Sequence, residues 1–252
     1  MVMTLSRNEY LEDYYAYSPG ESAVFIGPTG TGKTVFAQQC LDEAMRQNPR
    51  LSVSTAMPKP ADDQTVDWAG RSDFKITDHW PAERYFWQHK PRGYIHWPKH
   101  IRGDEDKNED HLRNAFKRQL SDEFWRGESL VFLDDSYRIS CGLKCGKYVD
   151  KTLTEGRANG AGVFAVLQQP KGTVSTGSVS GFHYSQPSKL FLYRDGTESN
   201  RERYTEIAMG LDPRIIDSAV LDLKTYRINN CNVSDVLVLD RAGPYMCVVT
   251  PF

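Results

Sequence analysis

The sequence of 252 residues lacks a long hydrophobic run. No stretch approaches the roughly 18 consecutive apolar residues of a membrane-spanning helix, and residues 1–17 lack the apolar core of a secretory signal peptide. These absences argue against direct membrane insertion and against secretion. They predict a soluble, cytoplasmic protein.

Cysteine is also scarce, with five residues scattered along the chain: Cys40, Cys141, Cys145, Cys231 and Cys247. Only Cys141 and Cys145 are close in sequence, and no second pair accompanies them, which argues against a zinc site. An odd number of dispersed cysteines favours reduced thiols and therefore a cytosolic compartment.

The chain carries little net charge, with 31 basic and 33 acidic residues and a formal charge of −2. This balance excludes a protein coated in basic surface, so any contact with nucleic acid must come from local patches or from a ring that focuses a few cations. A hydrophobic content of 39% and a charged content of 25% are typical of globular proteins. At this length, one α/β domain over residues 1–252 is expected.

What the sequence does contain is a phosphate-binding loop, because Gly27–Thr34 fits the pattern G-x-x-x-x-G-K-[ST] without a gap. The apolar run Ser22–Ile26 before it predicts a buried strand, and the apolar stripe within Val35–Gln47 predicts a helix. A glycine-rich turn between a strand and a helix directs several backbone N–H groups at one anion. We therefore expect ATP and Mg²⁺ as cofactors, with Lys33 near the β- and γ-phosphates and the Thr34 hydroxyl on the metal. The predicted nucleotide-binding residues are Gly27, Pro28, Thr29, Gly30, Thr31, Gly32, Lys33, Thr34 and Val35.

A second acidic site follows about a hundred residues later, where the apolar run Leu130–Leu133 ends in Asp134 and Asp135. This is the form of a Walker B strand, in which Asp134 supports the metal and Asp135 activates water as a general base. ATPases of this type commonly carry Asp-Glu here, and the shorter Asp135 differs from them. The alternative is that the two aspartates form a turn or helix cap after a core strand.

A third block comprises Gly156–Gly162, the apolar strand Val163–Leu167 and then Gln168-Gln169-Pro170. The order Gly-Arg-Ala-x-Gly, β-strand, Gln-x-Pro resembles the FtsK/HerA superfamily of ring-forming, DNA-pumping ATPases. The resemblance covers the three nucleotide motifs, roughly residues 22–194. It implies that Gln168 is a sensor of the γ-phosphate and that Arg157 is an arginine finger acting across a subunit interface. The plain alternatives are an ordinary strand-end glutamine and a solvated arginine at a helix end.

The expected fold is an α/β P-loop NTPase of the additional-strand, RecA-like type, with a mainly parallel sheet, helices on both faces and a C-terminal hairpin. Residues 1–20 form an N-terminal extension, 57–127 an irregular insertion and 171–188 a flexible loop. Further strands are expected at 51–56, 93–97, 189–193, 236–240 and 245–249, and further helices at 110–124, 147–157, 199–209 and 213–221.

Two segments are candidates for substrate contact. His89–Arg102 interleaves cations with aromatics, a composition that can bind phosphates and stack bases, although an exposed strand edge with a solvated loop is slightly favoured. Lys171–Gly181 is rich in Gly and Ser and could line a pore. Four tyrosines before residue 18 favour packing against the chain's own domain over a neighbour or a capsid.

The resemblance implies a Mg²⁺-dependent ATPase that assembles as a ring, hexameric in this superfamily, and moves double-stranded DNA. A compact member without membrane segments is most similar to viral genome-packaging ATPases, which implies capsid or portal-vertex partners and a place in the host cytoplasm or the virion. A HerA-like or conjugation-type translocase or helicase is the close alternative. A nucleotide-gated assembly protein and a P-loop kinase for a small acceptor are the other two hypotheses.

Overall fold

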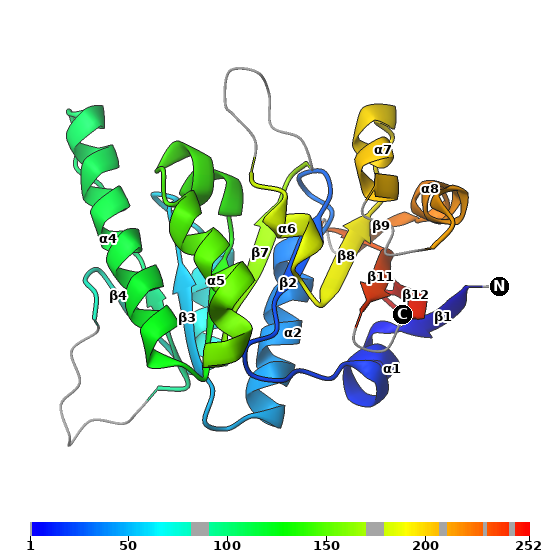
Figure 1. Cartoon of the computed structure of the whole chain (residues 1–252), viewed down its shortest axis with the longest axis horizontal. Coiled ribbons are helices and arrows are strands. Elements are labelled where there is room, and N and C mark those ends of the chain that lie inside the picture. Colours follow the sequence, from blue (N-terminus) through cyan, green and yellow to red (C-terminus); the bar gives the residue numbers. More distant parts are fainter. Residues whose placement is uncertain (1, 82–90, 170–178, 207–210, 229–230, 242–244) are drawn as a thin grey trace.

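The computed structural model describes residues 2–81, 91–169, 179–206, 211–228, 231–241 and 245–252. A ten-stranded sheet runs through the molecule with helices on both of its faces (Figure 1). Its strands are, in sheet order, β1 (Met3–Ser6), β12 (Tyr245–Thr250), β11 (Val236–Asp240), β8 (Lys189–Tyr193), β2 (Ala23–Ile26), β7 (Ala161–Leu167), β6 (Ser129–Leu133), β3 (Ser52–Ala56), β5 (Gly93–His96) and β4 (Phe74–Thr77). A separate hairpin joins β9 (Thr225–Ile228) and β10 (Cys231–Ser234).

The helices are α1 (Arg7–Glu9), α2 (Lys33–Gln47), α3 (Asp63–Arg71), α4 (Glu105–Arg126), α5 (Gly146–Asn159), α6 (Phe182–Ser185), α7 (Glu198–Glu206) and α8 (Pro213–Asp222), with π-helical turns η1 (Tyr10–Tyr14) and η2 (Arg138–Gly142). Within the described residues, none combines the length and apolar composition that a membrane crossing requires.

Both faces of the central strands are buried, which explains their unbroken apolar sequences. Along β2, Phe25 packs in the layer with α2, α3 and the N-terminal turns, whereas Ile26 packs in the opposite layer with α4, α5 and α8. Phe25 stacks on Phe191 of β8, with ring centroids 4.3 Å apart. The expected arrangement of helices on both faces is confirmed.

The order of the parallel strands identifies the subtype of the fold. Seven strands from β8 to β4 are mutually parallel, and β7 lies between β2 and β6. The strand before the phosphate loop is therefore separated from the Asp134–Asp135 strand by one additional strand, as the sequence predicted. The antiparallel hairpin of β11 and β12 is also confirmed.

Residues 57–127 are more regular than expected. Their described part contributes α3, β4, β5 and α4, and β5 pairs with both β3 and β4. The prediction of an irregular insertion is therefore wrong for these residues. In the candidate segment His89–Arg102, residues 89–90 lie outside the described residues, and Tyr94, Ile95 and His96 are buried within the sheet. Neither an exposed strand edge nor an accessible row of aromatics is present in β5.

The N-terminal residues belong to the same core. β1 pairs in parallel with β12, and Tyr10, Tyr15 and Tyr17 are buried, so packing against the chain's own domain is confirmed for these three tyrosines, whereas Tyr14 is exposed. Of the predicted loop 171–188, residues 171–178 lie outside the described part of the chain. The remainder, residues 179–188, contains the short helix α6, whose His183 and Tyr184 are buried.

Candidate nucleotide-binding site

The phosphate loop joins the carboxyl end of β2 to the N-terminus of α2, which begins at Lys33. Gly30 and Gly32 have φ values of +81° and +83°, in the left-handed region that favours glycine. Gly27 is required for another reason, since a Cβ there would lie 2.5 Å from the Tyr193 Cβ atom. The Thr31 hydroxyl donates to the Pro28 carbonyl over 3.0 Å, which tightens the turn.

Lys33 is held inside this loop. Its Nζ donates to the Pro28 carbonyl oxygen over 2.6 Å, and the residue is buried. Burial lowers the pKa of Lys33 to about 8, although the carboxylate of Asp134 opposes that effect. The ammonium group therefore lies among the backbone groups that define the loop, as a P-loop lysine must.

The two residues predicted to serve the metal are in direct contact. The Thr34 hydroxyl donates to Asp134 Oδ1 over 2.7 Å, although the two residues are a hundred positions apart in sequence. Asp134 follows β6 and is buried, and Thr34 is in the first turn of α2. The fold therefore brings a hydroxyl and a carboxylate oxygen together beside the phosphate loop.

Lys59 is a member of the site that its local sequence did not predict. It lies in the loop after β3, and its Nζ forms an ion pair with Asp134 Oδ2 and lies 3.5 Å from Asp62 Oδ2. Burial disfavours the charged form, but the two carboxylates outweigh this and raise the pKa of Lys59. No local motif marks this lysine. The only available signal was its position after a parallel strand that neighbours β6.

Asp135 is half-buried at the same edge. Its Oδ1 accepts a hydrogen bond over 2.9 Å from the backbone N–H of Arg138, which is the first residue of η2. This is the cap geometry that the sequence left open as the alternative to catalysis. Burial raises the pKa of Asp135, and the neighbouring Asp134 raises it further. One carboxylate oxygen thus fixes the turn, and the group is a stronger base than an ordinary aspartate.

Gln168 borders the phosphate loop at the end of β7. Leu167 is the register partner of Ile26, and the Gly27 N–H donates to the Leu167 carbonyl over 3.2 Å. Gln168 is exposed. A glutamine one residue beyond this contact is placed beside the loop, which fits the predicted sensor position.

Arg157 lies at the opposite edge of the sheet. It is exposed near the C-terminal end of α5 and lines a cavity of about 410 Å³ together with Gly20, Ser22 and Ser188, which precede β2 and β8. The phosphate loop follows β2 at its carboxyl end. Arg157 is therefore not part of the nucleotide site of its own chain.

The donor set fits Mg²⁺ bound together with a polyphosphate. Mg²⁺ takes one or two protein oxygens and completes its shell with phosphate and water, and Thr34 and Asp134 supply such oxygens. Among the described residues, no group of three or more His, Cys, Asp or Glu side chains could hold a metal on its own.

No family model matches the sequence, and no curated protein matches it. Solved structures do match. The genome-packaging NTPase B204 of Sulfolobus turreted icosahedral virus 2, in complex with AMPPCP, has a TM-score of 0.57 at 13% identity, over 94% of this chain and 100% of that one. The chain has the fold of a P-loop NTPase.

Two further neighbours are longer proteins. The conjugation coupling protein TcpA of pCW3, with ATPγS, has a TM-score of 0.50 at 11% identity, over 92% of this chain and 61% of that one. The cytoplasmic domain of the Type VII secretion ATPase EccC of Thermomonospora curvata has a TM-score of 0.54 at 10% identity, over 94% of this chain and 26% of that one. Proteins with different named functions therefore share this fold. The chain spans only part of the length of TcpA and of EccC.

Proposed function

We propose that the chain is a Mg²⁺-dependent ATPase that moves double-stranded DNA, and that it packages a viral genome into a capsid. The observation that carries the ATPase assignment is the contact between Thr34 and Asp134 beside a phosphate loop that contains Lys33. The likeness in fold to B204, over nearly the whole of both chains, supports the packaging assignment. The motor would act in the host cytoplasm or in the virion, with capsid or portal-vertex proteins as partners.

In this proposal each residue has a separate task. The loop N–H groups and Lys33 bind the β- and γ-phosphates, while Thr34 and Asp134 hold Mg²⁺. When bound, the metal neutralises charge on the phosphates. Asp135 orients a water and accepts its proton through the carboxylate oxygen that does not bond Arg138, and Gln168 contacts the γ-phosphate.

Arg157 acts on a neighbouring subunit in this proposal. Because it lies at the edge of the sheet opposite the phosphate loop, it could reach a nucleotide only in another copy of the chain. A closed ring, hexameric by the resemblance to FtsK/HerA proteins, would bring the amino edge of one subunit to the carboxyl edge of the next. The guanidinium would then stabilise charge on the γ-phosphate in trans.

A conjugation-type DNA translocase is the second candidate, favoured by the likeness to TcpA. One experiment tests the motor assignment that both share: steady-state ATP hydrolysis with and without double-stranded DNA, together with the mass in solution. The expected result is DNA-stimulated turnover by a ring. A monomer whose turnover ignores DNA would instead favour a switch or a small-molecule kinase.

A further inference from the structure

A cavity of about 590 Å³ opens at the amino edge of the sheet, and we call it the amino-edge pocket. The lining residues that matter for its chemistry are Arg50, Ser52, Arg92, Tyr94, Arg126 and Glu128. Ser52 is the first residue of β3, a strand of five residues whose other end leads toward Lys59. With a rise of about 3.3 Å per residue, the pocket lies on the order of 15 Å from the phosphate-loop edge.

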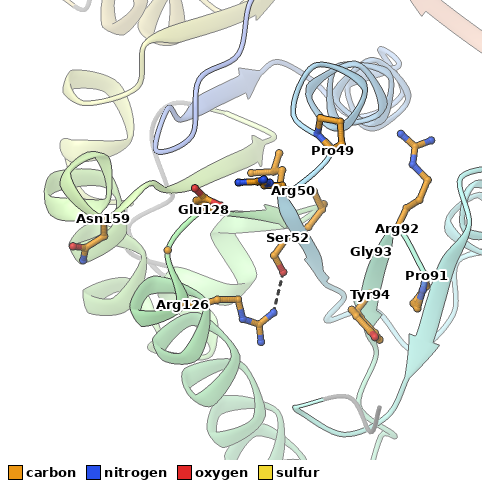
Figure 2. Close-up of a pocket in the computed structure, with 13 residues that line it drawn as sticks. Pro49, Arg50, Ser52, Pro91, Arg92, Gly93, Tyr94, Arg126, Glu128 and Asn159 are labelled. Atoms are coloured by element: carbon orange, nitrogen blue, oxygen red, sulfur yellow. Dashed lines mark hydrogen bonds between the residues drawn. The ribbon is translucent and has the colours of Figure 1, made fainter. Parts of the chain in front are cut away.

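Three arginines from separate segments line this pocket, and Figure 2 shows the Arg126 side chain turned toward Ser52 and the Arg92 side chain extending away from both. Arg50 follows α2, Arg92 precedes β5, and Arg126 is the last residue of α4. Glu128 is the sole carboxylate among the lining residues, so the pocket is locally positive in a chain whose net charge is −2. A concave surface with one sign of charge concentrates ligands of the opposite sign.

The three arginines differ in the contacts that hold them. Arg50 and Arg92 are both exposed, and within the described part of the chain neither lies at ion-pair distance from a carboxylate, although the charge of Arg92 acts electrostatically on Asp42 of α2. Arg126 is oriented, because its Nη1 donates to Ser52 Oγ over 2.9 Å and lies 3.3 Å from Glu123 Oε1. The pocket therefore combines one guanidinium that is held in place with two exposed guanidinium groups that no described carboxylate holds at ion-pair distance.

The lining also indicates which part of a ligand is recognised. Tyr94 is the one aromatic lining residue and is only 4% exposed, so no ring face is offered to a nucleobase. Guanidinium groups match phosphate oxygens in a forked geometry, and contacts to phosphate dominate the affinity of proteins for DNA. The chemistry favours a row of phosphates over a nucleoside.

We propose that the amino-edge pocket binds phosphate groups, and that in the proposed motor these belong to the DNA backbone. The assignment of these phosphate groups to DNA rests on the function proposed above. The site would hold DNA at the edge of each subunit opposite its own phosphate loop, in addition to any contact at the carboxyl edge.

The test is duplex DNA binding by the triple variant R50Q/R92Q/R126Q, measured by fluorescence anisotropy with a 30-bp duplex over a range of salt concentrations. We expect affinity about tenfold weaker near 0.1 M salt and a plot of log K against log[salt] that is shallower by about two to three units, one for each lost phosphate contact. The double variant R50Q/R92Q leaves the bonds of Arg126 intact and should show about two thirds of the change in slope.

The control is R46Q/R118Q/R214Q, which removes the same charge from three surface arginines that each have a carboxylate neighbour. It should bind DNA as the wild type does. Equal losses in the control and pocket variants would mean general electrostatics and would overturn the proposal.

A second arm separates the two sources of phosphate. Binding of inorganic phosphate is measured with the phosphate loop saturated by a non-hydrolysable ATP analogue and Mg²⁺. Loss of phosphate binding in the pocket variant with unchanged DNA affinity would support a site for a free anion and overturn the DNA assignment. No change in either ligand would overturn the pocket altogether. DNA-stimulated ATP hydrolysis of the wild type tests the motor itself, so the two failures are distinguishable.

Discussion

Lys59 and Thr34 bind the two oxygens of a single carboxylate, that of Asp134. Thr34 donates its hydroxyl to Oδ1 over 2.7 Å, and the Lys59 ammonium pairs with Oδ2. A lysine thus neutralises the buried carboxylate on which Mg²⁺ binding would depend. A metal ion bound to Asp134 would compete with Lys59 for the Oδ2 oxygen, or the two would share it after Lys59 changes its position.

Removing Lys59 should therefore strengthen metal binding in the absence of nucleotide. For K59M we expect Mg²⁺ affinity about two- to fivefold higher, because Lys59 is 41% exposed and half-exposed ion pairs contribute at most about 1 kcal/mol. The Mg²⁺ affinity is measured by competition with Mn²⁺, and bound Mn²⁺ is followed by electron paramagnetic resonance. K107M, which removes a surface pair with Asp104, is the matched control and should leave affinity unchanged. Weaker Mg²⁺ binding in K59M would contradict the competition.

Asp135 should determine the rate of hydrolysis and not the binding of nucleotide. D135N should lower kcat by about a hundredfold or more, the usual contribution of a general base, while ATP binding is kept. D135E should remain active, because it keeps a carboxylate at this position. Parallel loss of ATP binding and turnover in D135N would assign the residue to folding of the η2 turn instead.

The pH dependence of turnover follows from the same residue. The base must be ionised to accept a proton, and burial raises the pKa of Asp135 above the ordinary value of 3.8. Hydrolysis should therefore fall as the pH drops through this raised pKa, with an acid limb at higher pH than a solvent-exposed aspartate would give. Pre-steady-state hydrolysis at saturating ATP measures it. An acid limb that persists unchanged in D135E would mean that another group titrates.

Gly27 makes a prediction about stability. A Cβ there would lie 2.5 Å from Tyr193 Cβ in the tightly packed centre of the sheet, so G27A should lose about 1–3 kcal/mol. At this chain length that lowers Tm by about 2–4 °C per kcal/mol. A Cβ at Gly70 in α3 would have no atom within 4 Å, so G70A is the control and should be no less stable than the wild type. Equal Tm values for the wild type and G27A would show that the sheet relaxes there.

Two buried histidines should make the fold acid-sensitive. Burial lowers the pKa of His96 and of His183 to about 4 from the ordinary 6.5. A depressed pKa in the folded state means that stability is fully present above about pH 6.5 and is lost as the pH falls toward 4. Urea unfolding at pH 7.5 and 5.0 should show a smaller decrease for H183N than for the wild type. Exposed His111 supplies the control H111N, which should follow the wild type.

The phosphate loop and the acidic end of β6 were predictable as local structures from the sequence, because their signals are local. The loop Gly27–Thr34 and the run that ends in Asp134 each contain their whole pattern within eight residues, flanked by elements of the expected type. The additional strand β7 between β2 and β6 followed from the same motifs, and the sheet order confirms it.

The parts that were missed depend on contacts between distant residues. Lys59 contacts Asp134, which is 75 positions away in the sequence, and no sequence pattern around Lys59 predicts this contact. The strand β4 was missed because it has four residues and only its first and last are buried. The helix expected at 110–124 begins earlier, because the Asp104 side chain accepts a hydrogen bond from the Lys107 N–H and caps α4 at its start. The location of Arg157 at the amino edge also required the fold.

The most direct test of the proposed motor is whether ATP hydrolysis moves the chain along duplex DNA. A labelled third strand bound to a duplex should be displaced by the wild type with ATP and Mg²⁺, and should stay bound with K33A or without ATP. Displacement that requires hydrolysis would establish a DNA translocase. Brisk ATP hydrolysis that leaves the third strand in place at every duplex length would contradict the motor and leave a nucleotide-dependent assembly protein.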